Sequence, residues 1–185
     1  MRLIVLFILL PVLTACQGAV IVRAPIPNLN YIVDDFDYAS RNGEIRTRVG
    51  DDPFGGPHAE FSAKVTKLMY GANVGGDVVF TSSPQGKGSG RHHVVMLFNP
   101  PISADEEDFC GPKVQIPTLP LTNALRLVST FCYEDQMLST ADGQVSGVRS
   151  PQSPLFRKLV RQVTLALFPP VDHLDVSGEG DNSTN

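Results

Sequence analysis

The sequence has few charged residues, few cysteines and no apolar run long enough to cross a membrane. Charged side chains make up 18% of the 185 residues, below the usual ~25%, but 42% of the residues are hydrophobic, which excludes a wholly disordered chain. Acidic residues outnumber basic ones by 19 to 15, which argues against a general nucleic-acid binder. Three cysteines are too few for a disulfide scaffold or a cysteine-rich zinc module. The length is sufficient for one domain with a buried core.

The N-terminus is the most informative segment, because it has the layout of a secretory signal. A single Arg2 precedes an apolar run from Leu3 to Leu10, and the segment ends in small residues after Pro11. Twelve of the first fifteen residues are apolar, whereas a transmembrane helix needs about 20. An exported protein is therefore expected rather than one with a membrane-spanning helix at this end.

The end of this segment, Leu13-Thr14-Ala15-Cys16, resembles the lipobox of bacterial lipoproteins. In that family the cysteine thiol receives a diacylglycerol, the peptide bond before it is cut and the new amine is usually acylated. The resemblance implies that residues 1–15 are a lipoprotein signal peptide and that Cys16 is the lipidated N-terminus. Gln17 is not the Asp that favours retention in the inner membrane, so the resemblance favours the outer membrane, facing the periplasm. The alternative is an ordinary signal peptide with a chance cysteine near its end.

Two further segments are expected to lie outside the folded domain. Residues 16–30 carry two prolines and no helical period, and we interpret them as the lipidated N-terminus and a flexible tether about 20 Å in extent. Residues 171–185 are acidic, contain glycine and lack an apolar pattern, which predicts a disordered tail. A single domain is therefore expected over residues 31–170.

Apolar spacing within this domain predicts strands and helices without regular βαβ alternation. The expected strands are 31–38, 44–49, 77–82, 91–98, 125–133 and 137–141, the first two joined by a hairpin turn at Asn42-Gly43 and the last ended by Asp142-Gly143. Helices are expected over 57–70 and from Pro154, behind the capping residue Ser153, to Pro169. We therefore expect an α+β fold: an antiparallel sheet of about five to six strands with two amphipathic helices mainly on one face.

Two cysteines remain after lipidation, Cys110 and Cys132, and they are a candidate disulfide. The compartment outside the inner membrane is oxidising, and a bridge would close a loop of about 23 residues. The alternative is two separate buried thiols.

No catalytic residue, cofactor site or metal site is predicted. The Gly86-Lys87 pair lacks the P-loop glycine four residues earlier and the Ser or Thr that follows the lysine. His92 and His93 are adjacent on a predicted strand, so their side chains point to opposite faces and cannot readily share a metal. Acidic clusters at 34–37 and 105–108 lack calcium-loop spacing and are interpreted as solvated faces and helix-start charges.

Three basic residues, Arg157, Lys158 and Arg161, lie early on the last predicted helix. Such a patch faces anionic lipid or an acidic partner, or is simply a solvated helix face.

The first functional hypothesis is a non-enzymatic, lipid-anchored envelope protein that binds or supports an envelope assembly through a protein partner, with no role for nucleic acid. Two alternatives stay open: an anchored hydrolase of cell-wall or surface polymer, and an accessory subunit of an envelope transporter. Converging carboxylates in a cleft would favour the hydrolase, and an exposed apolar patch or free sheet edge would favour binding.

Overall fold

The computed structural model describes residues 19–23, 26–73, 77–83, 90–111 and 116–170. The expected signal peptide, Cys16, most of the Gly86–Gly90 segment and the acidic tail lie outside these residues. None of the helices within them combines the length and apolar character that crossing a membrane requires.

Seven strands, three α-helices and one short 3-10 helix follow one another along the described chain. In order they are β1 (Val20–Val22), β2 (Ile26–Pro27), α1 (Asp34–Ser40), β3 (Glu44–Val49), α2 (His58–Met69), β4 (Val79–Thr81), β5 (His92–Phe98), η1 (Glu107–Cys110), β6 (Ala124–Tyr133), β7 (Gln136–Ser146) and α3 (Pro154–Leu167).

The strands form one mixed sheet in the order β1-β7-β6-β5-β3-β4, with β2 also paired to β7. The long strands β5, β6 and β7 are antiparallel neighbours, and β1 and β2 run antiparallel along the free edge of β7. At the other edge, β3 is parallel to both β4 and β5. The α+β class is thus confirmed, whereas the sheet is mixed rather than purely antiparallel.

The parallel pairing of β3 with β4 arises from the helical connection between these strands. Helix α2 lies between these strands in sequence, and a strand that returns through a helix enters the sheet in the same direction as the strand before it. A βαβ unit is therefore present in a sheet that the sequence predicted to be antiparallel.

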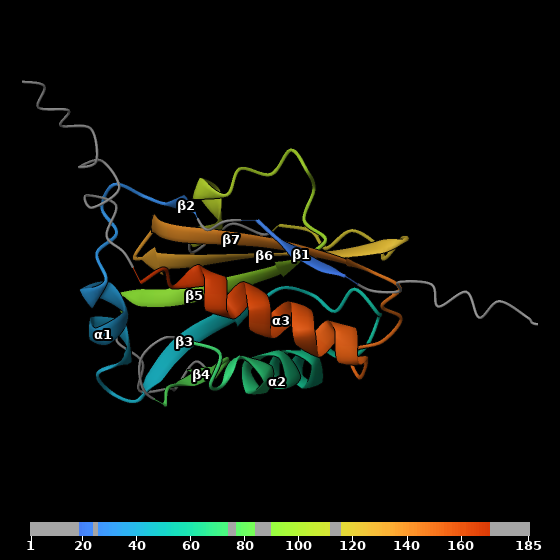
Figure 1. Ribbon diagram of the computed structural model, residues 1–185, viewed down its shortest axis with the longest axis horizontal. Helices are drawn as coiled ribbons and strands as arrows, with labels where there is room; N and C mark the ends of the chain where they lie inside the picture. The colour runs from blue at the N-terminus through green and yellow to red at the C-terminus, as the bar shows by residue number, and fades with distance from the viewer. Residues whose placement is uncertain (1–18, 24–25, 74–76, 84–89, 112–115, 171–185) are drawn as a thin grey trace, which may run out of the picture.

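Helices α2 and α3 lie side by side on one face of the sheet, as predicted (Figure 1). Both are amphipathic, and α3 begins where Ser153 accepts a hydrogen bond from the backbone N–H of Leu155, as its capping role predicts. The core beneath them is rich in phenylalanine: Phe61, Phe98 and Phe156 contact one another with ring centroids 4.9 to 5.8 Å apart.

Gly143 on β7 allows α3 to pack closely against the sheet. A Cβ atom at this position would lie 2.5 Å from Cγ2 of Val163 and 2.9 Å from Cδ1 of Leu159. The Asp142-Gly143 pair was expected to end the strand, and this is wrong. Strand β7 continues to Ser146 because both of its edges are paired there, one with β6 and the other with β1. The glycine therefore serves close packing rather than a turn.

The opposite face of the sheet carries a smaller apolar cluster under η1. It consists of Val95, Leu97, Phe109, Cys110, Val128 and Cys132. Figure 1 shows η1 on the side of the sheet away from α2 and α3, so both faces are covered.

Two predicted segments differ from the structure. Residues 34–40 form α1 instead of continuing a strand, because Phe36 and Ala39 face the core at helical spacing and Asp35 accepts a hydrogen bond from the backbone N–H of Ile32. The tether expected over 16–30 is wrong for β1 and β2, which pair with β7. Val20 and Val22 pack against the main core, so part of this segment belongs to the domain.

Candidate functional site

The two cysteines predicted as a pair join η1 to β6. Cys110 and Cys132 form a disulfide with the sulfur atoms 2.02 Å and the Cα atoms 5.6 Å apart. Both cysteines are almost fully buried in the cluster under η1, which makes the bridge part of the packing on this face of the sheet.

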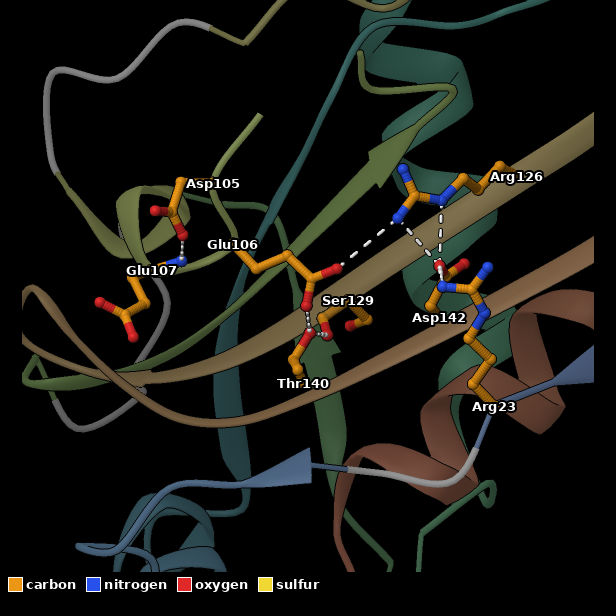
Figure 2. Close-up of polar contacts among 8 residues, drawn as sticks. All are labelled: Arg23, Asp105, Glu106, Glu107, Arg126, Ser129, Thr140 and Asp142. Atoms are coloured by element: carbon orange, nitrogen blue, oxygen red, sulfur yellow. Dashed lines mark hydrogen bonds and ion pairs between the residues drawn. The ribbon is translucent and has the colours of Figure 1, made fainter. Parts of the chain in front are cut away.

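A network of charged side chains on the same face surrounds Arg126 of β6 (Figure 2). Its Nε and Nη2 donate to Oδ2 of Asp142 at 3.0 and 2.9 Å, and Nη2 lies 3.6 Å from Oε1 of Glu106. Arg23, whose side chain is 78% exposed, reaches the same oxygen of Asp142 at 3.5 Å. The network therefore joins the segment after β1, the two long central strands and the segment before η1.

Glu106 comes from the acidic cluster that was interpreted as solvated, but its carboxylate has two partners. Besides Arg126, its Oε2 accepts a hydrogen bond of 2.9 Å from the hydroxyl of Thr140 on β7. Asp105 accepts from the backbone N–H of Glu107 and so shapes the start of η1, as a helix-start charge is expected to do. Glu106 therefore connects the start of η1 to the sheet.

His92 lies in a cleft of about 620 Å³ between α1, the start of β5 and the β6–β7 turn. We call this the His92 cleft; its lining residues are Asn30, Asp35, Tyr38, Arg41, Gly90, Arg91, His92, Tyr133, Gln136 and Leu138. Nε2 of His92 lies 3.6 Å from Oδ1 of Asp35, too far for a good hydrogen bond, and the ring stacks on Phe131 at 5.7 Å. The cleft is rimmed by Arg91, which donates to the Tyr133 hydroxyl at 2.9 Å.

The environment of His92 favours its neutral form. Burial lowers the pKa of the imidazole below its ordinary value, the nearby Asp35 carboxylate opposes this shift, and Arg41 adds to it. The imidazole is therefore neutral near pH 7 and capable of accepting a proton.

His93 lies in a different cleft on the opposite face of the sheet, as the strand alternation predicts. This His93 cleft has a volume of about 540 Å³ and is lined by Arg46, Arg48, Gly90, Arg91, His93, Cys110, Glu134 and Asp135. Burial and then the charge of Arg48 lower the pKa of His93, and hydrogen bonds to the backbone of Arg91 and Cys110 oppose them. Arg48 donates to the carbonyl oxygens of Phe109 and Gly111, which fixes η1 beside this cleft.

The lining of the His92 cleft is polar and suits the binding of a polar ligand. The His92 cleft presents two tyrosines, two arginines, two amides, one carboxylate and one imidazole, which are groups that bind polar ligands. Its lining includes no serine, threonine or cysteine that His92 could activate as a nucleophile. Among the described residues, no three His, Cys, Asp or Glu side chains form a set that could hold a metal ion.

The contact between His92 and Asp35 was missed by sequence reasoning, as was the Arg126 network. The partners are separated by 57 residues in the first case and by 16 and 20 in the second, and no local pattern connects them. The sequence predicted only which face of the sheet each strand residue would lie on.

No protein-family model, no curated protein and no solved structure matches this chain.

Proposed function

We propose that this chain is a bacterial lipoprotein, anchored through Cys16 at the periplasmic face of the outer membrane, which acts as a non-enzymatic adaptor for an envelope partner. The observation that carries the proposal is the Leu13-Thr14-Ala15-Cys16 lipobox behind a short apolar segment. Several acyl chains anchor a protein far more firmly than one chain does, since each buried CH₂ contributes about 0.8 kcal/mol.

The arrangement of the sheet supports an adaptor with separate anchored and binding ends. Val20, four residues after Cys16, pairs with Val145 near the end of β7, whereas the His92 cleft lies at the opposite end of β7, beside Gln136. Nine residues of extended strand span about 30 Å. A partner that binds in the His92 cleft would therefore meet the end of the domain away from the anchor.

The anchor is tested by replacing Cys16 with serine. We expect the Cys16→Ser chain to leave the membrane fraction, and the unaltered chain to incorporate labelled fatty acid. Membrane fractionation that is the same for both chains would contradict the lipid anchor.

The partner is tested by placing a photo-crosslinking amino acid at Tyr38 in living cells. Tyr38 lines the His92 cleft and is 56% exposed. Tyr70, which is 47% exposed and lies outside that cleft, is the matched control position. We expect Tyr38 but not Tyr70 to capture a reproducible envelope protein; capture of a transporter component would identify the accessory-subunit alternative, and capture of none would count against the adaptor.

One observation favours the hydrolase alternative, namely that the neutral His92 and the Asp35 carboxylate share one cleft. Such a pair could activate a water molecule as a general base. If the chain cleaves cell-wall or surface polymer, His92→Asn and Asp35→Asn should each abolish the cleavage while membrane anchoring is retained. Crosslinking from Tyr38 without any polymer cleavage supports the adaptor.

A further inference from the structure

We propose that one end of the domain rests on anionic lipid headgroups and holds the sheet end-on to the membrane. We call this surface the basic end; it is formed by the exposed side chains of Arg149, Arg157 and Lys158. The inference rests on the proposed lipid anchor and adds to it an orientation and a class of lipid. Three observations support it: the position of these cations, their lack of partners within the described residues, and the short stretch of chain that connects Cys16 to the domain.

The strand register fixes the position of the basic end. Val20 opposes Val145, so the start of β1 lies at the end of the sheet where β7 leaves it after Ser146. The chain then passes through residues 147–153 and begins α3 at Pro154, so the basic end lies at the same end of the molecule as Val20 (Figure 1). Helix α3 also packs beside β1, so the first strand of the sheet begins next to this helix.

The segment that contains the basic end is positively charged. Residues 143–170 contain no Asp or Glu but contain four cations. Three of these, at the basic end, have exposed side chains for which the described part of the chain provides no ion pair. The fourth, Arg161, is already used, because it donates to the carbonyl oxygens of Tyr70 and Gly71. The basic end is thus available for an external anion.

Two of the carboxylates near this end lie on the α2 side. Asp52 and Glu60 line a groove with Arg149, and Asp52 accepts hydrogen bonds from the backbone N–H groups of Phe54 and Gly56. Arg157 and Lys158 lie beyond this groove on α3, so the positive character is concentrated at α3 and beside β1.

The link between Cys16 and the first strand is short. Val20 lies four positions after Cys16 in the sequence, and a fully extended chain of this length spans at most about 14 Å. The surface charge of a leaflet acts over about one Debye length, which is about 8 Å at physiological salt, and a link this short allows the basic end to approach the leaflet that closely. Each Lys or Arg near an anionic surface contributes about 1 kcal/mol, which is a factor of about five in binding.

An exposed apolar side chain supports the end-on orientation. Ile102 is 94% exposed and follows β5, which ends at the same end of the sheet, because Phe98 opposes Leu127 near the start of β6. It lies in the segment leading to η1, on the side away from α3. The basic end and Ile102 can contact one plane together only if that plane crosses the end of the sheet.

The test uses the mature lipidated chain in lipid nanodiscs that contain either phosphatidylglycerol or only phosphatidylcholine. Backbone amide exchange is followed in residues 147–158 and, for comparison, in the β6–β7 turn at the other end. We expect exchange in 147–158 to be slower by several-fold on phosphatidylglycerol, and this protection to disappear in about 0.5 M salt. Equal exchange on the two lipids, or protection at the β6–β7 turn instead, would overturn the proposal.

Two matched double variants identify the groups responsible. R157Q/K158Q removes two cations from the basic end, and R41Q/R91Q removes two exposed cations from the opposite end. We expect the first to lose the protection and the second to keep it. Protection that requires an acidic envelope protein and is absent on phosphatidylglycerol would assign the surface to a protein and reject the lipid.

Failure of the anchor can be distinguished from failure of the basic end by using the unlipidated Cys16→Ser chain. Its co-sedimentation with phosphatidylglycerol vesicles depends on the cations and not on acylation. R157Q/K158Q should lower vesicle partitioning about 25-fold, at about fivefold for each cation, whereas R41Q/R91Q should leave it nearly unchanged. Equal partitioning of the two double variants would reject the basic end even if the anchor is real.

Discussion

At the scale of single residues, Asp142 offers a direct comparison between a well-placed and a loosely placed arginine. Arg126 and Arg23 approach the same carboxylate oxygen, at 2.9 and 3.5 Å, but their side chains are 25% and 78% exposed. We expect Arg126→Gln to lower the free energy of unfolding by about 1–3 kcal/mol, because it removes charge-assisted hydrogen bonds to a carboxylate that is only 11% exposed.

The matched control is Arg23→Gln, which should cost about 0–1 kcal/mol because its partner contact is solvent-screened. Denaturant unfolding of both variants measures the difference. A loss for Arg23→Gln as large as that for Arg126→Gln would contradict this account of the network.

The two neighbouring histidines predict how stability changes with pH. Burial lowers the pKa of both His92 and His93 in the folded chain. At pH values between these lowered pKa values and about 6.5, the unfolded chain therefore binds more protons than the folded chain. Their contribution to stability is therefore complete above about pH 6.5 and is lost as the pH falls through the lower pKa of the folded state. Unfolding measured between about pH 5.5 and 7.5 avoids most carboxylate titration, and the slope should flatten in His92→Gln and His93→Gln. An unchanged slope in both variants would assign the dependence to other groups.

At the scale of elements, the disulfide determines how firmly η1 is held over the sheet. Cys110 and Cys132 are 22 residues apart, and in the chain-entropy model such a loop contributes about 3 kcal/mol. We expect reduction of the folded protein to lower the free energy of unfolding by about this amount, and Cys110→Ala/Cys132→Ala to be insensitive to reductant. Alkylation of both thiols in unfolded, unreduced protein would show that the bridge is not formed.

The elements that the sequence predicts well are those with enough residues to display a period. Helices α2 and α3 span 12 and 14 residues, and β6 spans 10, so their buried faces are readable in advance. Helix α1 has only seven residues, and apolar residues at 32, 36 and 38 fit a strand as well as a helix. In the folded chain Phe36 contacts Phe168, with ring centroids 4.7 Å apart, and no local pattern contains this tertiary contact.

Strand pairing was the least predictable feature, because it is a property of two segments rather than one. Residues 20–22 read as apolar in a proline-containing stretch, and only the free edge of β7 makes them a strand. The same argument applies to β3, whose alternation was predicted with its buried residues but whose parallel partner β5 lies beyond the α2 crossover. The candidate site could not be predicted for the same reason, since His92 and Asp35 come together only when the sheet is assembled.

At the scale of the whole molecule, the sheet separates two surfaces of different character. The start of β1, the basic end and Ile102 lie at one end of the long strands, and both histidine clefts lie at the other. The strands between them are rigid, since β6 is paired along its whole length with β7 and covered on both faces. A partner held in the His92 cleft would thus be kept at a defined height above the membrane.

The short connection between Cys16 and β1 provides the final prediction. A Gly/Ser insertion of about twelve residues after Gly18 lengthens the link from four residues to about sixteen, with a typical extent of 20–24 Å. Since effective concentration falls with roughly the 3/2 power of link length, attraction of the basic end to the surface should weaken about eightfold. We expect the inserted chain to remain in the membrane fraction but to lose most of its amide protection in residues 147–158 on phosphatidylglycerol nanodiscs. The same insertion after Pro170, at the opposite end of the domain, is the control and should change neither measurement; protection that is independent of the Gly18 insertion would show that the short link does not hold the basic end at the membrane.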